Sequence, residues 1–123
     1  MKARWGGENE RAVNSRDELN VVIDDVRRSG QPTMIFLMAE NGTILVFGVG
    51  LDESVLTFME PDGTSFHSLG DRERRGYLRF LCRDQIDEFM TEMAVPEREA
   101  LVAAEQFLAT NERPSVVVWE PDW

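Results

Sequence analysis

The sequence has one cysteine, one histidine and no long apolar run, and each shortage excludes a class of protein. Cys82 cannot form an intramolecular disulfide, and its place in the apolar run YLRFLC favours a buried, unreactive thiol. No stretch approaches the roughly 18 apolar residues of a membrane span, and MKARWGGENERAV lacks the apolar core of a secretion signal. We therefore expect a cytoplasmic protein that does not contact membranes.

The usual catalytic residue sets are also missing. His67 has no second His or Cys at metal-ligand spacing, and the glycines Gly48 and Gly50 are not followed by a phosphate-loop pattern. Adjacent acids such as Asp87 and Glu88 point in different directions in a helix or strand, so they are weak evidence for acid-base chemistry. We expect a binding protein that is not an enzyme and that holds no metal or cofactor.

Positive charge is scarce in two long segments. The chain carries a net charge of -10; residues 31–68 hold five acids and no Lys or Arg, and residues 85–123 hold nine acids and two Arg. This balance repels phosphate backbones and anionic lipid, so nucleic acid is not an expected direct partner. The acid excess serves either solubility or a basic protein partner.

The length fits one domain, which we assign to residues 1–123. A first helix is predicted after Ser15, because Glu18 three residues later completes a capping box and Gly30 can end the helix. Its apolar stripe has the spacing i, i+3, i+4, i+7 and consists of Leu19, Val22, Ile23 and Val26.

Strands are predicted from Gln31 onward. PTMIFLMAE and TILVFGVG flank Asn41-Gly42, which favours a two-residue turn with both residues at positive φ. Both segments are apolar on both faces, as in central strands of a sheet. ESVLTFME, SFHSL and YLRFLC are predicted as further strands, separated by the turn PDGT and the loop DRERRG.

The C-terminal third combines a helix with a last strand. RDQIDEFMTEM fits both a helical stripe and a strand, whereas Pro96 suits the first position of a helix that runs to Thr110, with a buried stripe of Leu101, Ala104, Phe107 and Leu108. SVVVW then reads as a short strand buried on both faces. The predicted fold is α+β: an antiparallel or mixed sheet of about five to six strands, an N-terminal and a C-terminal helix on one face, and a short final strand.

The segment VPEREALVAAEQFLATNERPSVVVWEPDW resembles the immunity-protein-1 family of bacterial polymorphic toxin systems. Members end in a helix, an FLATGxRP-like corner and a short strand with Trp; the matching residues here are Phe107, Leu108, Ala109, Thr110, Arg113, Pro114 and Trp119. Val95-Pro96 and Gly6-Gly7-Glu8 also match, while Asn111 replaces the usual Gly. The family places a strand before the Val-Pro pair, so the resemblance favours a strand for EFMTEM.

The resemblance implies an antidote that binds and neutralises a cognate toxin domain, often a nucleic-acid deaminase. Such an enzyme admits a polyanion and needs a basic substrate groove, which an acidic surface can fill. We expect toxin contact from the acids of the acid-rich segments and from the C-terminal aromatic: Asp52, Glu53, Glu60, Asp62, Glu120, Asp122 and Trp123.

The family-motif residues are expected to be structural. Arg113 and Pro114 fix the corner between helix and strand, with the guanidinium on backbone carbonyls or on a carboxylate such as Glu8. Trp119 packs over the last helix, and Phe107 and Thr110 belong to the same motif.

Two other functions remain open from the sequence. One is a small ligand-binding or enzymatic α+β domain with a pocket near His67, Tyr77 and Glu88. The other is a subunit that self-associates through an edge strand.

Overall fold

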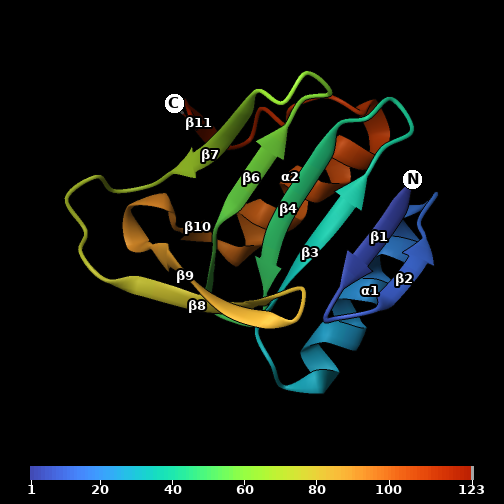
Figure 1. The fold of residues 1–123 in the computed structure, drawn as a ribbon, viewed down its shortest axis with the longest axis horizontal. Helices are drawn as coiled ribbons and strands as arrows, with labels where there is room; N and C mark the ends of the chain where they lie inside the picture. Colours follow the sequence, from blue (N-terminus) through green and yellow to red (C-terminus); the bar gives the residue numbers. More distant parts are fainter. Residues whose placement is uncertain (123) are drawn as a thin grey trace.

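A computed structural model describes residues 1–122 and shows an α+β fold with two α-helices, α1 (Arg16–Ser29) and α2 (Glu97–Thr110), against one large sheet (Figure 1). The main path of the sheet is β11 (Val118–Pro121), β7 (Ser65–Leu69), β6 (Leu56–Met59), β4 (Ile44–Val49), β3 (Thr33–Met38), β1 (Lys2–Trp5) and β2 (Asn9–Ala12). No helix in the described chain is long and apolar enough to cross a membrane.

Two more strands branch from this path. The hairpin of β8 (Tyr77–Cys82) and β9 (Gln85–Met90) joins β3 through one parallel pairing, Thr33 with Leu81. A separate pair is formed by β5 (Glu53–Ser54) and β10 (Val95–Pro96), and a 3-10 turn, η1 (Thr91–Met93), precedes β10. The predicted sheet of about five to six strands is therefore wrong, since the sheet has nine.

The N-terminal hairpin β1–β2 accounts for part of this difference. Its segments KARW and NERA are charged and mostly exposed, so they carry no apolar strand pattern. They form strands because β1 pairs with β3 along its whole length, which buries Ala3 against the helix-side core.

Helix α1 confirms the prediction from its caps and stripe. The Glu18 amide donates to the Ser15 hydroxyl oxygen at 3.2 Å, and Gly30 ends the helix at φ 73°. All four stripe residues are buried. The caps and the stripe lie within one segment of the sequence, which is why this helix could be predicted.

The β3–β4 hairpin is confirmed, but its predicted two-residue turn is wrong. The Ala39 amide donates to the Thr43 carbonyl at 2.9 Å, which closes a longer loop, and Gly42 alone takes a positive φ of 92°. Asn41 acts through its side chain, accepting from the Thr43 amide at 3.1 Å and the Thr43 hydroxyl at 2.6 Å. These side-chain bonds stabilise the turn, so Asn41 does not need the left-handed backbone conformation of a two-residue turn.

Strands β3 and β4 are covered on one face along their length and on the other face over part of it, so the two-sided burial predicted for central strands holds in part. On one face Ile35, Leu37, Leu45 and Phe47 pack with the buried stripes of α1 and α2. The buried stripe of α2 is Ala100, Ala103, Ala104 and Phe107; Leu101 and Leu108 are only partly buried, which corrects the predicted stripe. Small alanines let α2 lie close to the sheet.

The opposite face is covered at one end by the β8–β9 hairpin, whose Phe80 packs with Met34, Val46 and Val55. Gly48 makes this possible, because an ideal Cβ there would lie 2.5 Å from the Phe80 ring. The hairpin therefore seats its aromatic ring directly on the backbone of β4.

Residues 85–93 form strand β9 followed by η1, so the strand expected from the family resemblance is confirmed for Glu88–Met90 and the helical periodicity misleads. Cross-strand pairing with β8, from Tyr77–Met90 to Cys82–Gln85, decides the conformation. Pro96 is the N-cap of α2 and not its first helical residue.

The last strand differs from its prediction in place and burial. SVVVW was expected to be buried on both faces, but β11 begins at Val118, lies at the edge of the sheet and pairs with β7. Val118 is 64% exposed, while Val117 turns into the core before the strand starts. Val116 and Val117 therefore pack against the helix-side core, and the chain reaches the edge of the sheet at Val118.

We predict that Gly48→Ala lowers the free energy of unfolding by about 2 kcal/mol, because the methyl group would overlap the Phe80 ring. Chemical denaturation of four proteins measures this: wild type, Gly48→Ala, Phe80→Leu and the double variant. The alanine should cost less in the Phe80→Leu background; equal costs in both backgrounds would contradict the proposed contact.

Candidate functional site

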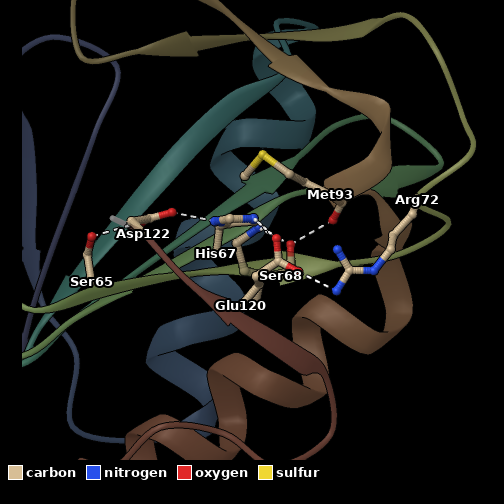
Figure 2. Close-up of polar contacts among 8 residues, drawn as sticks. Ser65, His67, Ser68, Arg72, Met93, Glu120 and Asp122 are labelled. Atoms are coloured by element: carbon tan, nitrogen blue, oxygen red, sulfur yellow. Dashed lines mark hydrogen bonds and ion pairs between the residues drawn. The ribbon is translucent and has the colours of Figure 1, made fainter.

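The side chain of His67 on β7 lies between two carboxylates of the edge strand β11 and its extension (Figure 2). Its Nδ1 contacts Asp122, and its Nε2 lies 3.7 Å from Glu120, which also pairs with Arg72. The Ser65 hydroxyl donates to Asp122 at 2.8 Å. These contacts tie the end of β11 to β7 and to the loop before β8.

The order of these groups does not match a hydrolase triad. In such a triad the imidazole bridges the hydroxyl and the carboxylate, so that it can take the hydroxyl proton. Here the Asp122 carboxylate lies between Ser65 and His67. The hydroxyl of the neighbouring Ser68 donates to the Met93 carbonyl at 2.7 Å, so its proton is directed away from His67. Residues 1–122 also contain no group of three His, Cys, Asp or Glu side chains placed to hold a metal ion. The cluster fastens a strand.

Several acids gather where the β3–β4 turn, the β6–β7 turn, the corner after α2 and the end of β11 meet. Pro61 lies next to Gly42, with 3.3 Å between Pro61 and an ideal Gly42 Cβ; the Thr43 hydroxyl oxygen lies 3.2 Å from the Asn111 carbonyl oxygen. The Asp122 amide donates to the Ser65 carbonyl at 3.0 Å. We call this region the acidic end; its acids are Glu40, Glu60, Asp62, Glu112 and Asp122.

Most of this negative charge is not neutralised. Within residues 1–122, Glu40, Glu60, Asp62 and Glu112 form no salt bridge. The Thr64 amide donates to Asp62 at 2.9 Å, and this bond lowers the pKa of the Asp62 carboxyl. Asp62 therefore stays charged while it orders the β6–β7 turn.

The corner between α2 and β11 is held by aromatic and backbone contacts. Asn111 ends α2 in the left-handed conformation at φ 58°, the role expected of the residue that replaces Gly. The guanidinium of Arg113 lies 4.2 Å from the centre of the Phe66 ring. The Trp119 indole N–H donates to the buried Pro114 carbonyl at 2.7 Å. These contacts position β11 and the acidic end.

The family described as Immunity protein Imm1 matches residues 7–121. The chain belongs to the Imm1 family of immunity proteins. The resemblance stated from the C-terminal corner is thus confirmed over nearly the whole chain. A search of curated proteins finds no match to this Imm1 chain. Membership in an immunity family implies a cognate toxin as partner and is consistent with its neutralisation.

The Imm1 structure separates the acids predicted for toxin contact. Glu60, Asp62 and Asp122 lie at the acidic end, with Glu120 beside them on β11. Asp52 and Glu53 lie at the opposite end of β4, where Arg74 contacts Glu53 through two nitrogens at 2.5 and 2.9 Å. Trp123 lies outside the described residues.

The motif residues of the Imm1 corner make mainly internal contacts. Trp119 packs on Phe58, with ring centres 6.2 Å apart, and Phe58 contacts Phe107 of α2 at 5.9 Å. The Thr110 hydroxyl donates to the Gln106 carbonyl at 2.9 Å. The expected contact between Arg113 and Glu8 is not formed, since Glu8 lies in the exposed β1–β2 turn at the other side of the sheet.

The alternative pocket does not bring its three residues together. A hollow of about 290 Å³ beside Tyr77 is lined by Arg72, Arg74, Arg75, Gly76, Met90 and Glu92. His67 and Glu88 lie outside it, and Glu88 pairs with Arg79 at 3.0 Å. Cys82 is half-buried, and burial raises the pKa of its thiol, which fits the expected unreactive side chain.

Sequence reasoning missed Glu40 and Glu112 at the acidic end. Each stands next to a turn-forming Asn: Glu40 precedes Asn41, and Glu112 follows Asn111. Their position beside predicted turns could have marked both acids as candidates. Which turns lie next to one another, however, depends on the order of the strands in the sheet, which the sequence does not give.

We predict that Trp119→Phe lowers the free energy of unfolding by about 1 kcal/mol, because phenylalanine leaves the buried Pro114 carbonyl without its donor. Thermal and urea unfolding measure the change. The neighbouring Val118→Ser is the matched control and should be nearly neutral, as Val118 is exposed. Equal effects at the two positions would refute the role given to the indole N–H.

Proposed function

We propose that this Imm1 protein neutralises a nucleic-acid deaminase toxin by binding it through the acidic end. The observation that carries the proposal is the group of carboxylates there that have no cationic partner among residues 1–122. Acids without a salt bridge on the turns of the sheet present negative charge at positions that the fold determines. A basic surface on the partner complements them.

The deaminase assignment rests on charge and on the partner class implied by the resemblance. A deaminase that acts on single-stranded nucleic acid holds its polyanionic substrate in a basic groove next to a zinc pocket. Carboxylates presented by the acidic end would occupy positions that phosphates take in the substrate. The Imm1 protein would then act by binding alone, in the cytoplasm of the cell that makes the toxin.

Among the acids predicted from the sequence, Glu60, Asp62 and Asp122 are the proposed toxin contacts, with Glu120 beside them. Glu53 contributes less, because Arg74 already balances its charge. Asp52 and Trp123 stay predictions. Opposite charge accelerates association and selects the partner, whereas slow dissociation needs a desolvated anchor.

Co-expression with the C-terminal domain of the toxin encoded beside this protein tests the function. We expect a complex that co-purifies, growth of cells that otherwise die, and loss of the toxin's deamination of single-stranded nucleic acid at equimolar Imm1 protein. A complex with a toxin of another chemistry would refute the deaminase assignment. Growth arrest unchanged by the Imm1 protein would refute neutralisation itself.

We predict that Glu40→Lys combined with Glu60→Lys slows association with the toxin by about tenfold or more at low salt, because two of the five acids of the acidic end change sign. The difference from wild type should shrink as salt rises. The matched control is Asp24→Lys with Asp84→Lys, which changes the net charge equally at exposed acids without salt bridges on α1 and the β8–β9 turn. Stopped-flow measurements with purified toxin domain give the rates; equal slowing by both pairs would reduce the effect to net charge.

A further inference from the structure

The two faces of the sheet are covered unequally. Both helices lie on one face, behind the sheet in Figure 1, whereas the β8–β9 hairpin covers only one end of the other face. The central strands expose part of four large apolar side chains on the helix-free face: Phe36, Met38, Ile44 and Met59. Of these, Phe36 lies next to the hairpin, with the guanidinium of Arg83 5.9 Å from the centre of its ring. Nothing within the described chain covers the four side chains fully.

Strand register places these apolar side chains in line with the acids of β11. Directly paired residues point to the same face of a sheet. One row across β3, β4, β6 and β7 is Met38, Ile44, Met59 and Ser65, and it ends at Asp122, which bonds Ser65 through both backbone and side chain. The next row is Phe36, Val46, Thr57, His67 and Glu120. The helix-free face thus has an apolar floor and an acidic margin.

The opposite margin of this face carries two bases and one acid. Lys2 and Arg4 on β1 both pair with Glu10 on β2, at 3.6 and 2.7 Å. The charged side chains that line a recess of about 660 Å³ beside Met38 are these three residues, Arg11 on β2 and Glu40 of the acidic end. The face therefore combines a hollow at the β1–β2 margin with acids at the acidic end that are unpaired within residues 1–122, whereas Glu120 is paired with Arg72 and Asp122 with His67.

We propose that the cognate toxin seats on this helix-free face, with Met38, Ile44 and Met59 as the apolar anchor beside the acidic end. The inference rests on the proposed function and adds the surface on which the complex is held. The partner it fits is the rim of a basic substrate groove that carries an apolar side chain next to Lys or Arg. The acids meet the bases of the rim, and the apolar side chain is desolvated against the floor.

Other exposed apolar side chains fit this partner less well. Val21 on α1 and Val102 on α2 stand singly on the helices. Tyr77, Ile86 and Met90 on the outer side of the β8–β9 hairpin are more exposed, but residues 77–90 hold two Arg and three acids, and Arg79 pairs with Glu88. The hairpin therefore offers less free negative charge to a basic groove than the acidic end, where Glu40, Glu60, Asp62 and Glu112 form no salt bridge within residues 1–122.

The test compares two double variants for binding to the purified toxin domain. The first variant, Ile44→Thr with Met59→Thr, removes the apolar anchor but places threonine, which is favoured in strands, at both positions. The second variant, Val21→Thr with Val102→Thr, makes the same kind of change on the helices. We expect the sheet variant to raise the dissociation constant by about tenfold or more, mainly through faster dissociation. The helix variant should bind as wild type does. Circular dichroism and thermal unfolding check that both variants fold.

Methionine oxidation of the wild-type chain gives a second measurement that needs no variant. Met38 and Met59 lie on the proposed surface, and Met90 lies on the hairpin, 48% exposed. Dilute peroxide followed by peptide mass spectrometry reports the oxidation rate of each, free and in complex. The proposal expects Met38 and Met59 to react at least about threefold more slowly in the complex.

The outcomes separate this inference from the proposed function. Slower oxidation of Met38 and Met59, with or without Met90, supports the surface. A wild-type complex in which Met38 and Met59 react as in the free chain, or in which Tyr77→Ser weakens binding and the sheet variant does not, overturns the surface while toxin binding stands. Failure of the wild-type chain to bind the toxin domain overturns both.

Discussion

Burial of β3 and β4 on both faces is the constraint on which the rest of the structure depends. These strands carry large apolar side chains on each side, and a sheet gains stability only where those side chains leave water. The helices cover one face completely, with alanines on α2 that permit close approach. The β8–β9 hairpin covers the other face only around Gly48, where Phe80 contacts the backbone. The rest of that face stays partly exposed, because a two-stranded hairpin is too small to cover the whole sheet as a third layer would.

The C-terminal corner decides where charge is displayed next to this face. Trp119 and Arg113 fasten the chain after α2 against Pro114 and Phe66, so β11 adds to β7 at the sheet edge. Glu120 and Asp122 then follow on the helix-free side. The motif residues of the family thus determine where Glu120 and Asp122 lie but do not themselves form the acidic margin. This explains why the most recognisable part of this chain is a structural corner.

Sequence reasoning succeeded where the determinants are local. The capping box of Ser15 and Glu18 and the stripe of α1 lie within one segment, and the fold follows them. It failed where pairing decides: β1 and β2 are polar and form because β3 offers an edge, and β9 is a strand because β8 lies beside it. The candidate site shows the same division. Glu60 and Asp62 could be identified from the sequence as acids of a turn, but their proximity to Glu40 depends on the order of the strands. The pairing of Glu53 with Arg74 is a contact between residues 21 positions apart, which the sequence does not show.

The acid excess also answers a problem that the uncovered face creates. An apolar sheet surface invites pairing between copies of the same chain, and such association would compete with a toxin for the same side chains. Two copies brought face to face each carry the charge of -10 and an acidic β11 margin, so their approach is opposed by like charge. A basic toxin meets no such barrier. The same carboxylates that attract the proposed partner therefore keep the apolar floor available to it, which ties the charge of the chain to the incomplete cover of its sheet.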